Sequence, residues 1–453
     1  MMGKTRGGGP PRPFGKAAIS VKKLAGLLLA ALLLALPVRA AEPVIRPIGG
    51  STYAYTYYAI DADGNLYAWG DSFHGAVGPT DQDPLPWEEA NILLDNARCV
   101  TGGFVMAAAV DTDGVLWGWG GYAGRTFGEE EPYRLLEDTA EVSIGDTQCT
   151  ALRTDGTVWV WGARSGASLK EHSNDPFFRP VQVLDHAARL EGNMAVLEDG
   201  TLVHFQYDGD TVTTRPLMEQ VADVRTWSGF DDSAYILVQG EDGSLWRVPR
   251  VTVSEGDAAY YVLGQPEKFL EDVVQFASGT AVTADGTLWA WGRGRPAMLD
   301  GGAVDPADPY DPEDCEAIVP ILEGVRWAEP SGNSTLAVLK DGSLWELPLA
   351  RAFQPEMEGT SLLREPRQLL DQALLPGDPP EWPEEAPAPT VLPSASLEAW
   401  EAGRADETGS AAPEAQPEPV PAAPKSNPAA SLAAVAASAA ALALIGWLRN
   451  RKH

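Results

Sequence analysis

A short motif recurs seven times along the chain. Each copy has an apolar stretch, an Asp-Gly pair and a second β-prone stretch, most clearly in L-Y-A-W-G, L-W-G-W-G, V-W-V-W-G and L-W-A-W-G. Consecutive glycines of these pairs are 42 to 56 residues apart, at Gly64, Gly114, Gly156, Gly200, Gly243, Gly286 and Gly342. Repeats of about 40 to 50 residues are typical of propeller blades. The recurrence therefore restricts the chain to a repeat fold and predicts seven blades.

Each unit has the pattern of a β-hairpin. An Asp-Gly pair between two β-prone stretches favours a tight turn, because glycine accepts the positive φ that such turns require. Trp117 and Trp119 share one strand face because they are two residues apart, and Leu116 on the other face is also apolar. Blades packed around an axis bury both faces, so we expect most of these tryptophans between blades. The sequence predicts an all-β fold, a seven-bladed β-propeller of four-stranded antiparallel blades at 41–375.

The first 40 residues have the features of a signal peptide. Basic residues precede the apolar run from Leu24 to Leu36, and V-R-A places small residues where a signal peptidase cleaves. We expect export and cleavage after Ala40. The alternative, an uncleaved membrane anchor, is weaker because the apolar run is short for a bilayer span.

The C-terminal part has the composition of a stalk and an anchor. Residues 376–428 are rich in Pro, Glu and Ala, cannot bury much apolar surface and are predicted to form a disordered linker. Residues 429–447 carry no charge and the tail at 448–453 is basic, which predicts one transmembrane helix and a basic cytoplasmic tail. The propeller would then be extracellular, on a single-pass protein of the cell membrane. A soluble or interfacial helix and a cleaved cell-wall sorting signal are the alternatives.

The motif resembles a known family. The pattern D-G-x-[LV]-[WY]-x-W-G, followed by a glycine-bounded turn such as G-D-S-F-H-G-A-V-G, is similar to the regulator of chromosome condensation repeat family of seven-bladed β-propellers. The resemblance covers about Glu42 to Leu375, although units four, five and seven read L-V-H-F-Q, L-W-R-V-P and L-W-E-L-P where W-G would fall. The context is that of an exported bacterial-type member. The resemblance also implies ring closure, so we expect the segment from Glu42 to Gly50 to complete the last blade.

Charge and cysteine content exclude some functions. The chain has 33 Lys and Arg against 64 Asp and Glu, a net charge of -31, which argues against a nucleic-acid partner. Cys99, Cys149 and Cys315 allow at most one disulfide, and the sequence does not say which. No cofactor motif or zinc-ligand spacing is present. D-A-D-G and D-T-D-G lack the rest of an EF-hand loop, and the acidic insertion from Asp305 to Asp314 fits a solvated loop, with calcium as the alternative.

The loops that follow the L-W-x-W-G strands are the best candidates for binding, because equivalent loops of a propeller gather on one face. Aromatic and Arg side chains are favoured interface anchors, and these loops carry Phe73, His74, Tyr122, Arg164, Arg293 and Arg295. The sequence predicts a surface-tethered, non-enzymatic recognition module for a protein or cell-envelope glycan, with a monomeric ectodomain. The alternatives are an extracellular hydrolase with a glycosidase-like carboxylate pair and a structural element of a surface assembly.

Overall fold

The computed structural model describes fourteen ranges of the chain: 41–50, 55–72, 75–103, 106–121, 129–144, 148–162, 180–207, 211–228, 234–255, 258–291, 318–331, 334–348, 366–383 and 385–402. The predicted signal peptide, transmembrane helix and basic tail lie outside these ranges. Within them, no helix combines the length and the apolar composition that crossing a bilayer requires.

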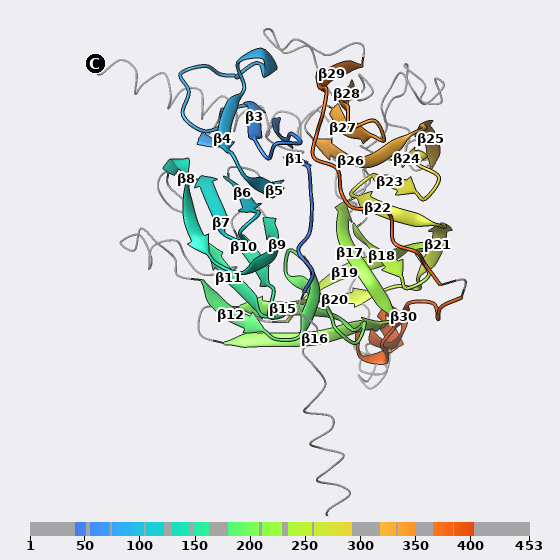
Figure 1. Ribbon diagram of the computed structural model, residues 1–453. Helices are drawn as coiled ribbons and strands as arrows, with labels where there is room; N and C mark the ends of the chain where they lie inside the picture. Colours follow the sequence, from blue (N-terminus) through green and yellow to red (C-terminus); the bar gives the residue numbers. More distant parts are fainter. Residues whose placement is uncertain are drawn as a thin grey trace, which may run out of the picture. The chain divides into compact units, whose positions relative to one another are not determined.

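Seven antiparallel sheets form a ring, and the first strand of each lies nearest the middle (Figure 1). The first three blades consist of β1 (Ile48–Gly50), β2 (Thr56–Ile60), β3 (Leu66–Gly70) and β4 (Asn91–Leu94); β5 (Ala97–Gly102), β6 (Met106–Asp111), β7 (Leu116–Gly120) and β8 (Glu129–Leu136); β9 (Thr139–Ile144), β10 (Gln148–Arg153), β11 (Val158–Gly162) and β12 (Val181–Leu184). Each blade therefore uses four strands in chain order.

The next two blades have additional strands. Blade 4 contains β13 (Ala187–Glu191), β14 (Met194–Leu197), β15 (Leu202–Tyr207) and β16 (Val212–Glu219), and its edge pairs with β30 (Thr390–Val391). Blade 5 contains β17 (Val221–Ser228), β18 (Ala234–Gly240), β19 (Leu245–Glu255) and β21 (Glu267–Leu270), and β19 also pairs with β20 (Ala258–Leu263).

The last two blades return to four strands. They consist of β22 (Val273–Ala277), β23 (Thr280–Thr283), β24 (Leu288–Ala290) and β25 (Val319–Leu322), then β26 (Val325–Ser331), β27 (Ser334–Leu339), β28 (Leu344–Pro348) and β29 (Arg367–Leu370). The prediction of seven four-stranded antiparallel blades is confirmed.

The Asp-Gly pairs form hairpin turns between the second and third strands. All seven glycines have a φ between 75° and 91°, which glycine adopts without strain. In blade 2, Asp111 Oδ1 accepts the N–H groups of Asp113 (3.0 Å) and Val115 (2.8 Å), and Oδ2 accepts the Trp117 Nε1–H (2.8 Å). The Asp111 carboxylate, the first of D-T-D-G, thus accepts hydrogen bonds from its own hairpin.

The tryptophans of the motif have two roles. The second one packs between blades: Trp119 is fully buried and meets Tyr58 of blade 1 edge to face, with ring centroids 5.7 Å apart. The first one is half-buried and donates its Nε1–H to the turn, as Trp117 does to Asp111 and Trp345 does to Ser343. The expectation of packing between blades therefore holds best for the second tryptophan.

The predicted closure of the ring is wrong. β1 pairs with β2 as the first strand of blade 1, and blade 7 has four strands of its own. The four residues of β29 suffice because the outer strands β4, β12, β21 and β25 are equally short. Blades 1 and 7 are joined directly, since Ala62 N–H donates to Gln372 O (3.0 Å) and Leu374 N–H donates to Ile60 O (2.9 Å).

The predicted linker begins too early. The segment at 376–401, called the strap here, belongs to the same compact unit as the blades. Trp382 donates its Nε1–H to Val273 O (3.1 Å), Leu392 N–H donates to Leu217 O (2.9 Å), and Ala395 is fully buried. The composition predicted disorder because the segment has few apolar residues. A few contacts, such as those of Trp382, Leu392 and Ala395, are enough to hold it on the blades.

The two faces of the ring differ. The turn face carries the seven Asp-Gly turns, and the loop face carries the connections from the third to the fourth strand of each blade. The N-terminal segment at 41–47 lies on the turn face, where Ala41 N–H donates to Thr154 O (2.9 Å) and Val44 N–H donates to Ala140 O (3.0 Å). Figure 1 shows this segment crossing the middle of the ring and the strap running from β29 past β22 to β30. Two segments of the chain therefore cover part of its turn face.

Candidate functional site

The six predicted binding residues lie outside the described ranges. Phe73 and His74 come after β3, Tyr122 after β7, Arg164 after β11, and the last two, Arg293 and Arg295, after β24. Each of these strands runs from its Asp-Gly turn toward the loop face. The topology thus agrees with a common face for the six positions, and their role stays a prediction.

The loop beside Phe73 and His74 is anchored to two blades. Ala76 O accepts the Tyr58 hydroxyl of blade 1 (2.7 Å) and the Trp119 Nε1–H of blade 2 (2.8 Å). Ala76 and Val77 are both buried. Two hydrogen bonds to one carbonyl fix this part of the loop face, so the adjacent positions start from a rigid base.

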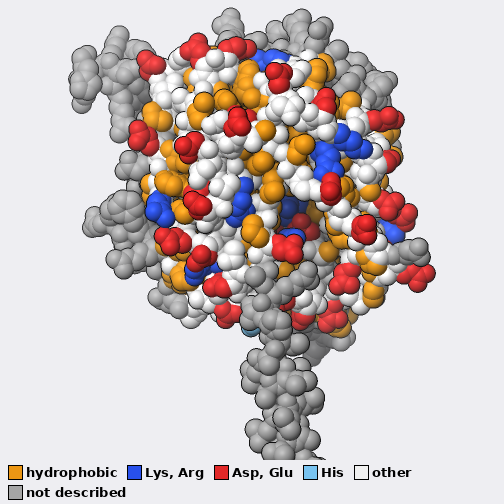
Figure 2. All heavy atoms as spheres, in the orientation of Figure 1, with side chains coloured by type: hydrophobic (Ala, Val, Ile, Leu, Met, Phe, Trp, Pro, Cys, Tyr) orange, Lys and Arg blue, Asp and Glu red, His pale blue; other side chains and the backbone are white. Residues whose placement is uncertain are grey.

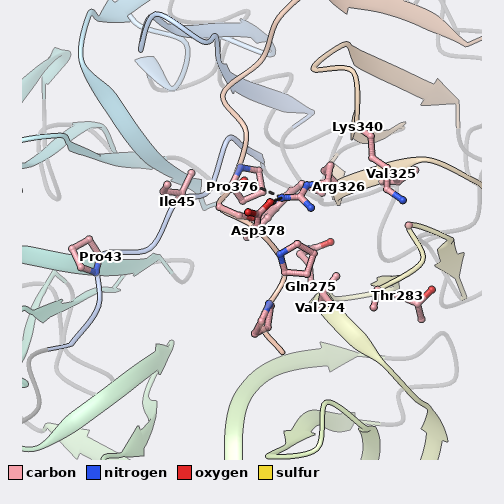
Figure 3. Close-up of a pocket in the computed structure, with 16 residues that line it drawn as sticks. Pro43, Ile45, Val274, Gln275, Thr283, Val325, Arg326, Lys340, Pro376 and Asp378 are labelled. Carbon is pink, nitrogen blue, oxygen red and sulfur yellow. Dashed lines mark hydrogen bonds and ion pairs between the residues drawn. The ribbon is translucent and has the colours of Figure 1, made fainter. Parts of the chain in front are cut away.

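A cavity of about 330 Å³ opens on the turn face. Its walls come from blades 6 and 7, the N-terminal segment (Pro43 and Ile45) and the strap (Pro376 to Pro380). Figure 3 shows Pro43 and Ile45 on one side of the cavity and Lys340 and Thr283 on the other. Elements far apart in the sequence therefore enclose a volume in the lower part of the range typical of small-molecule pockets.

Three polar groups of this cavity, on Arg326, Lys340 and Thr283, already have partners. Arg326 Nη2 donates to Gly377 O (2.6 Å) and lies 3.9 Å from Asp378 Oδ1. Figure 3 shows Arg326 beside Pro376 and Asp378. Lys340 Nζ donates to Asp285 O (2.6 Å). The Thr283 hydroxyl donates to Asp285 (2.7 Å), and this bond, with backbone N–H donors, lowers the pKa of Asp285. These groups hold the strap and a turn in place, which suits packing rather than proton transfer.

A charged network lies deep in the ring. Arg46 Nη2 and Arg225 Nη2 lie 3.6 Å and 3.9 Å from Glu141 Oε1, and Arg225 also pairs with Asp223 (2.8 Å). Burial raises the pKa of Glu141 against the opposing effect of Arg225. Burial alone would lower the pKa of Arg225, but neighbouring carboxylates, Asp223 foremost, raise it. The network links the N-terminal segment to blades 3 and 5, and no repeat position predicted it.

The described residues offer no metal site. No group of three or more His, Cys, Asp or Glu side chains in these ranges is arranged to hold an ion. Cys99 and Cys149 are free, buried thiols, whereas Cys315 and the acidic insertion lie outside the described ranges. On the face in Figure 2, acidic and basic side chains are both scattered from the middle to the edges.

The sequence matches no known family profile and no curated protein. Solved structures with a similar fold include Prp20p from Saccharomyces cerevisiae, studied for its binding to Gsp1p and histones (14% identity, TM-score 0.46, covering 74% of this chain and 88% of that one). Yeast RCC1 (Prp20) in complex with Kap60 matches at 17% identity and a TM-score of 0.45, covering 66% and 79%. Human WBSCR16 matches at 14% identity and a TM-score of 0.40, covering 56% and 77%. The structural neighbours are therefore RCC1-type and related propellers, and the blade assignment itself rests on the strand pairing of this chain.

Proposed function

We propose that this chain is a non-enzymatic recognition propeller that binds a protein through its loop face. The observation that carries the proposal is the coverage of the opposite face by the chain's own segments. The N-terminal segment and the strap pack against the turn face, and their carbonyls occupy Arg98 and Arg326. A partner would then dock on the loop face, where the connections from third to fourth strands project.

The chemistry of the loop face supports binding. Loops on a rigid scaffold are where proteins place recognition residues, and the anchoring of Ala76 to two blades makes such a scaffold. Phe73, Tyr122, Arg164 and Arg293 are residue types that contribute strongly to interfaces. The net charge of -31 favours a partner with a basic or neutral surface.

We extend the proposal to family and location. The motif of the repeats supports membership of the regulator of chromosome condensation repeat family, and the terminal segments support export and tethering to the cell membrane. Protease accessibility on intact cells that express the full chain would test the location. Protection of the propeller from added protease would contradict an extracellular position.

The binding proposal is tested with the full chain and two triple variants. Phe73→Ala with Tyr122→Ala and Arg293→Ala removes the predicted anchors. Asp63→Ala with Asp113→Ala and Asp199→Ala removes exposed turn-face side chains as the matched control. Cross-linking on cells followed by mass spectrometry should give a protein partner that the loop-face variant loses and the turn-face variant keeps. Equal capture by both variants would overturn the choice of face, and capture of glycan alone would replace the protein ligand.

A further inference from the structure

Two arginines from neighbouring blades lie near His204 at the junction of blades 4 and 5. Arg215 on β16 lies over the Tyr260 ring, 4.2 Å from its centroid, and Arg250 on β19 lies over the Tyr261 ring at 4.5 Å. His204 on β15 stands opposite Arg215 in the strand register, and its ring centroid is 4.3 Å from that of Tyr261. Five side chains from four strands therefore form one cluster, called the arginine cluster here.

The packing around this cluster holds it rigidly. β19 extends past the blade and pairs with β20, placing Arg250 opposite Leu263. Leu263, Leu217 of β16 and Val248 of β19 are buried in one apolar core. An arginine stacked on a tyrosine is restricted in its rotamers, so less entropy remains to be lost when its guanidinium binds a ligand.

No described carboxylate pairs with either arginine of this cluster. In the described part of the chain, Arg250 has no ion pair, and its buried Nε has no hydrogen-bond partner. Arg215 donates to a neutral group, the Ser394 carbonyl. Burial, with Arg250 and then Arg215, lowers the pKa of His204 to about 4, so its imidazole is neutral at pH 7. Among the described residues neither arginine is paired with a carboxylate, although the chain has 64 acidic and 33 basic side chains.

His204 adds a donor of its own. Asn193 Nδ2 lies 2.7 Å from His204 Nε2, and an amide nitrogen can only donate, so Nε2 is the acceptor. The proton of the neutral ring is then on Nδ1.

We propose that the arginine cluster is a binding site for an oxyanion, a carboxylate or sulfate group carried by a ligand. Guanidinium groups bond both kinds of group through parallel N–H donors, and such charge-assisted bonds are among the strongest in proteins. A buried nitrogen without a partner costs free energy, which a bound oxyanion would offset. The site lies on β15, β16, β19 and β20, beside the third-to-fourth connections of blades 4 and 5, and it uses none of the six predicted binding residues.

His204 provides the reporter for the test. The chain has five histidines, so side-chain resonances of the histidine-labelled full chain can be assigned by substitution. Sodium sulfate and sodium acetate are titrated separately at pH 6.5, at an ionic strength held constant with chloride. We expect a saturable shift of the His204 resonances and a rise in its pKa, because a bound anion favours the imidazolium. A shift with sulfate alone, or with acetate alone, supports the site and names its ligand group.

Variants separate binding from general salt effects. Arg250→Gln should weaken binding about tenfold or more, the effect of losing one charge-assisted bond, and Arg250→Lys should weaken it less because the charge remains. Arg134→Gln, which removes an exposed arginine of β8, should leave the titration unchanged. Equal melting temperatures of the variants show that folding is intact. No saturable shift in the natural sequence, or an equal shift in Arg250→Gln, would overturn the proposal.

Discussion

The guanidinium of Arg98 joins three parts of the ring, and its removal is our main prediction. Arg98 lies at the start of β5 with 8% of its surface exposed. It donates to four backbone carbonyls, from Nη1 to Val44 (2.6 Å) and Ala140 (3.2 Å), from Nη2 to Thr139 (2.6 Å), and from Nε to Asp111 (3.1 Å). These carbonyls belong to the N-terminal segment, to blade 3 and to blade 2 itself. A single side chain thus connects the N-terminal segment, blade 2 and blade 3 through hydrogen bonds.

The expected loss in the free energy of unfolding follows from these four hydrogen bonds. A hydrogen bond from a charged donor contributes about 1.5 to 3 kcal/mol, and contributions within one network do not add fully. Arg98→Met keeps most of the apolar stem but leaves buried carbonyls without this donor. We expect the free energy of unfolding to fall by about 3 to 5 kcal/mol, the range for a broken buried polar network. Arg98→Lys should lose less, because an ammonium can still reach one or two of the carbonyls.

Urea unfolding followed by tryptophan fluorescence measures this loss. The matched control is Arg134→Met, whose exposed side chain pairs with exposed Glu137 and should change stability by less than about 1 kcal/mol. Hydrogen exchange at the Val44 amide, which bonds Ala140 O, should accelerate in Arg98→Met. A loss below about 1 kcal/mol, or exchange unchanged at Val44, would show that other contacts hold the N-terminal segment.

Three further predictions concern the strap, a histidine and the thiols. Trp382→Ala removes a hydrogen bond and ring packing from the strap, so amide exchange at 389–396 should accelerate while the core of blade 1 stays protected. The pKa of His204 is about 4 against an ordinary 6.5, so the unfolded state binds the proton more tightly. The resulting stability is complete above pH 6.5 and declines toward pH 4, and His204→Gln should flatten this slope in urea unfolding. Burial raises the pKa of Cys99 and Cys149, so both should react with iodoacetamide far more slowly in the folded chain than in urea.

The blades were predictable because their signals are local. An Asp-Gly turn and two flanking β-prone stretches fix a hairpin within about a dozen residues, and seven hairpins at regular spacing leave few other folds. Pairing across the ring is different. The residues Ile48–Gly50 fit the pattern of a strand equally well in blade 1 and in blade 7. The strand pairing of the folded ring places them in blade 1. The strap was missed for a related reason, since its anchors are single residues in a proline-rich background.

The sequence indicates the arginine cluster through the positions where units four and five depart from the motif. The residue between the two aromatic positions is apolar and buried in the four units that keep the motif, as Ala68, Gly118, Val160 and Ala290. Unit four has His204 there, and unit five departs from the motif just before Arg250. A buried apolar residue changes to histidine at a cost in packing and desolvation. Two adjacent divergent units that direct polar side chains to one junction are therefore a stronger indication of a site than the conserved tryptophans, whose spacing is explained by the blades.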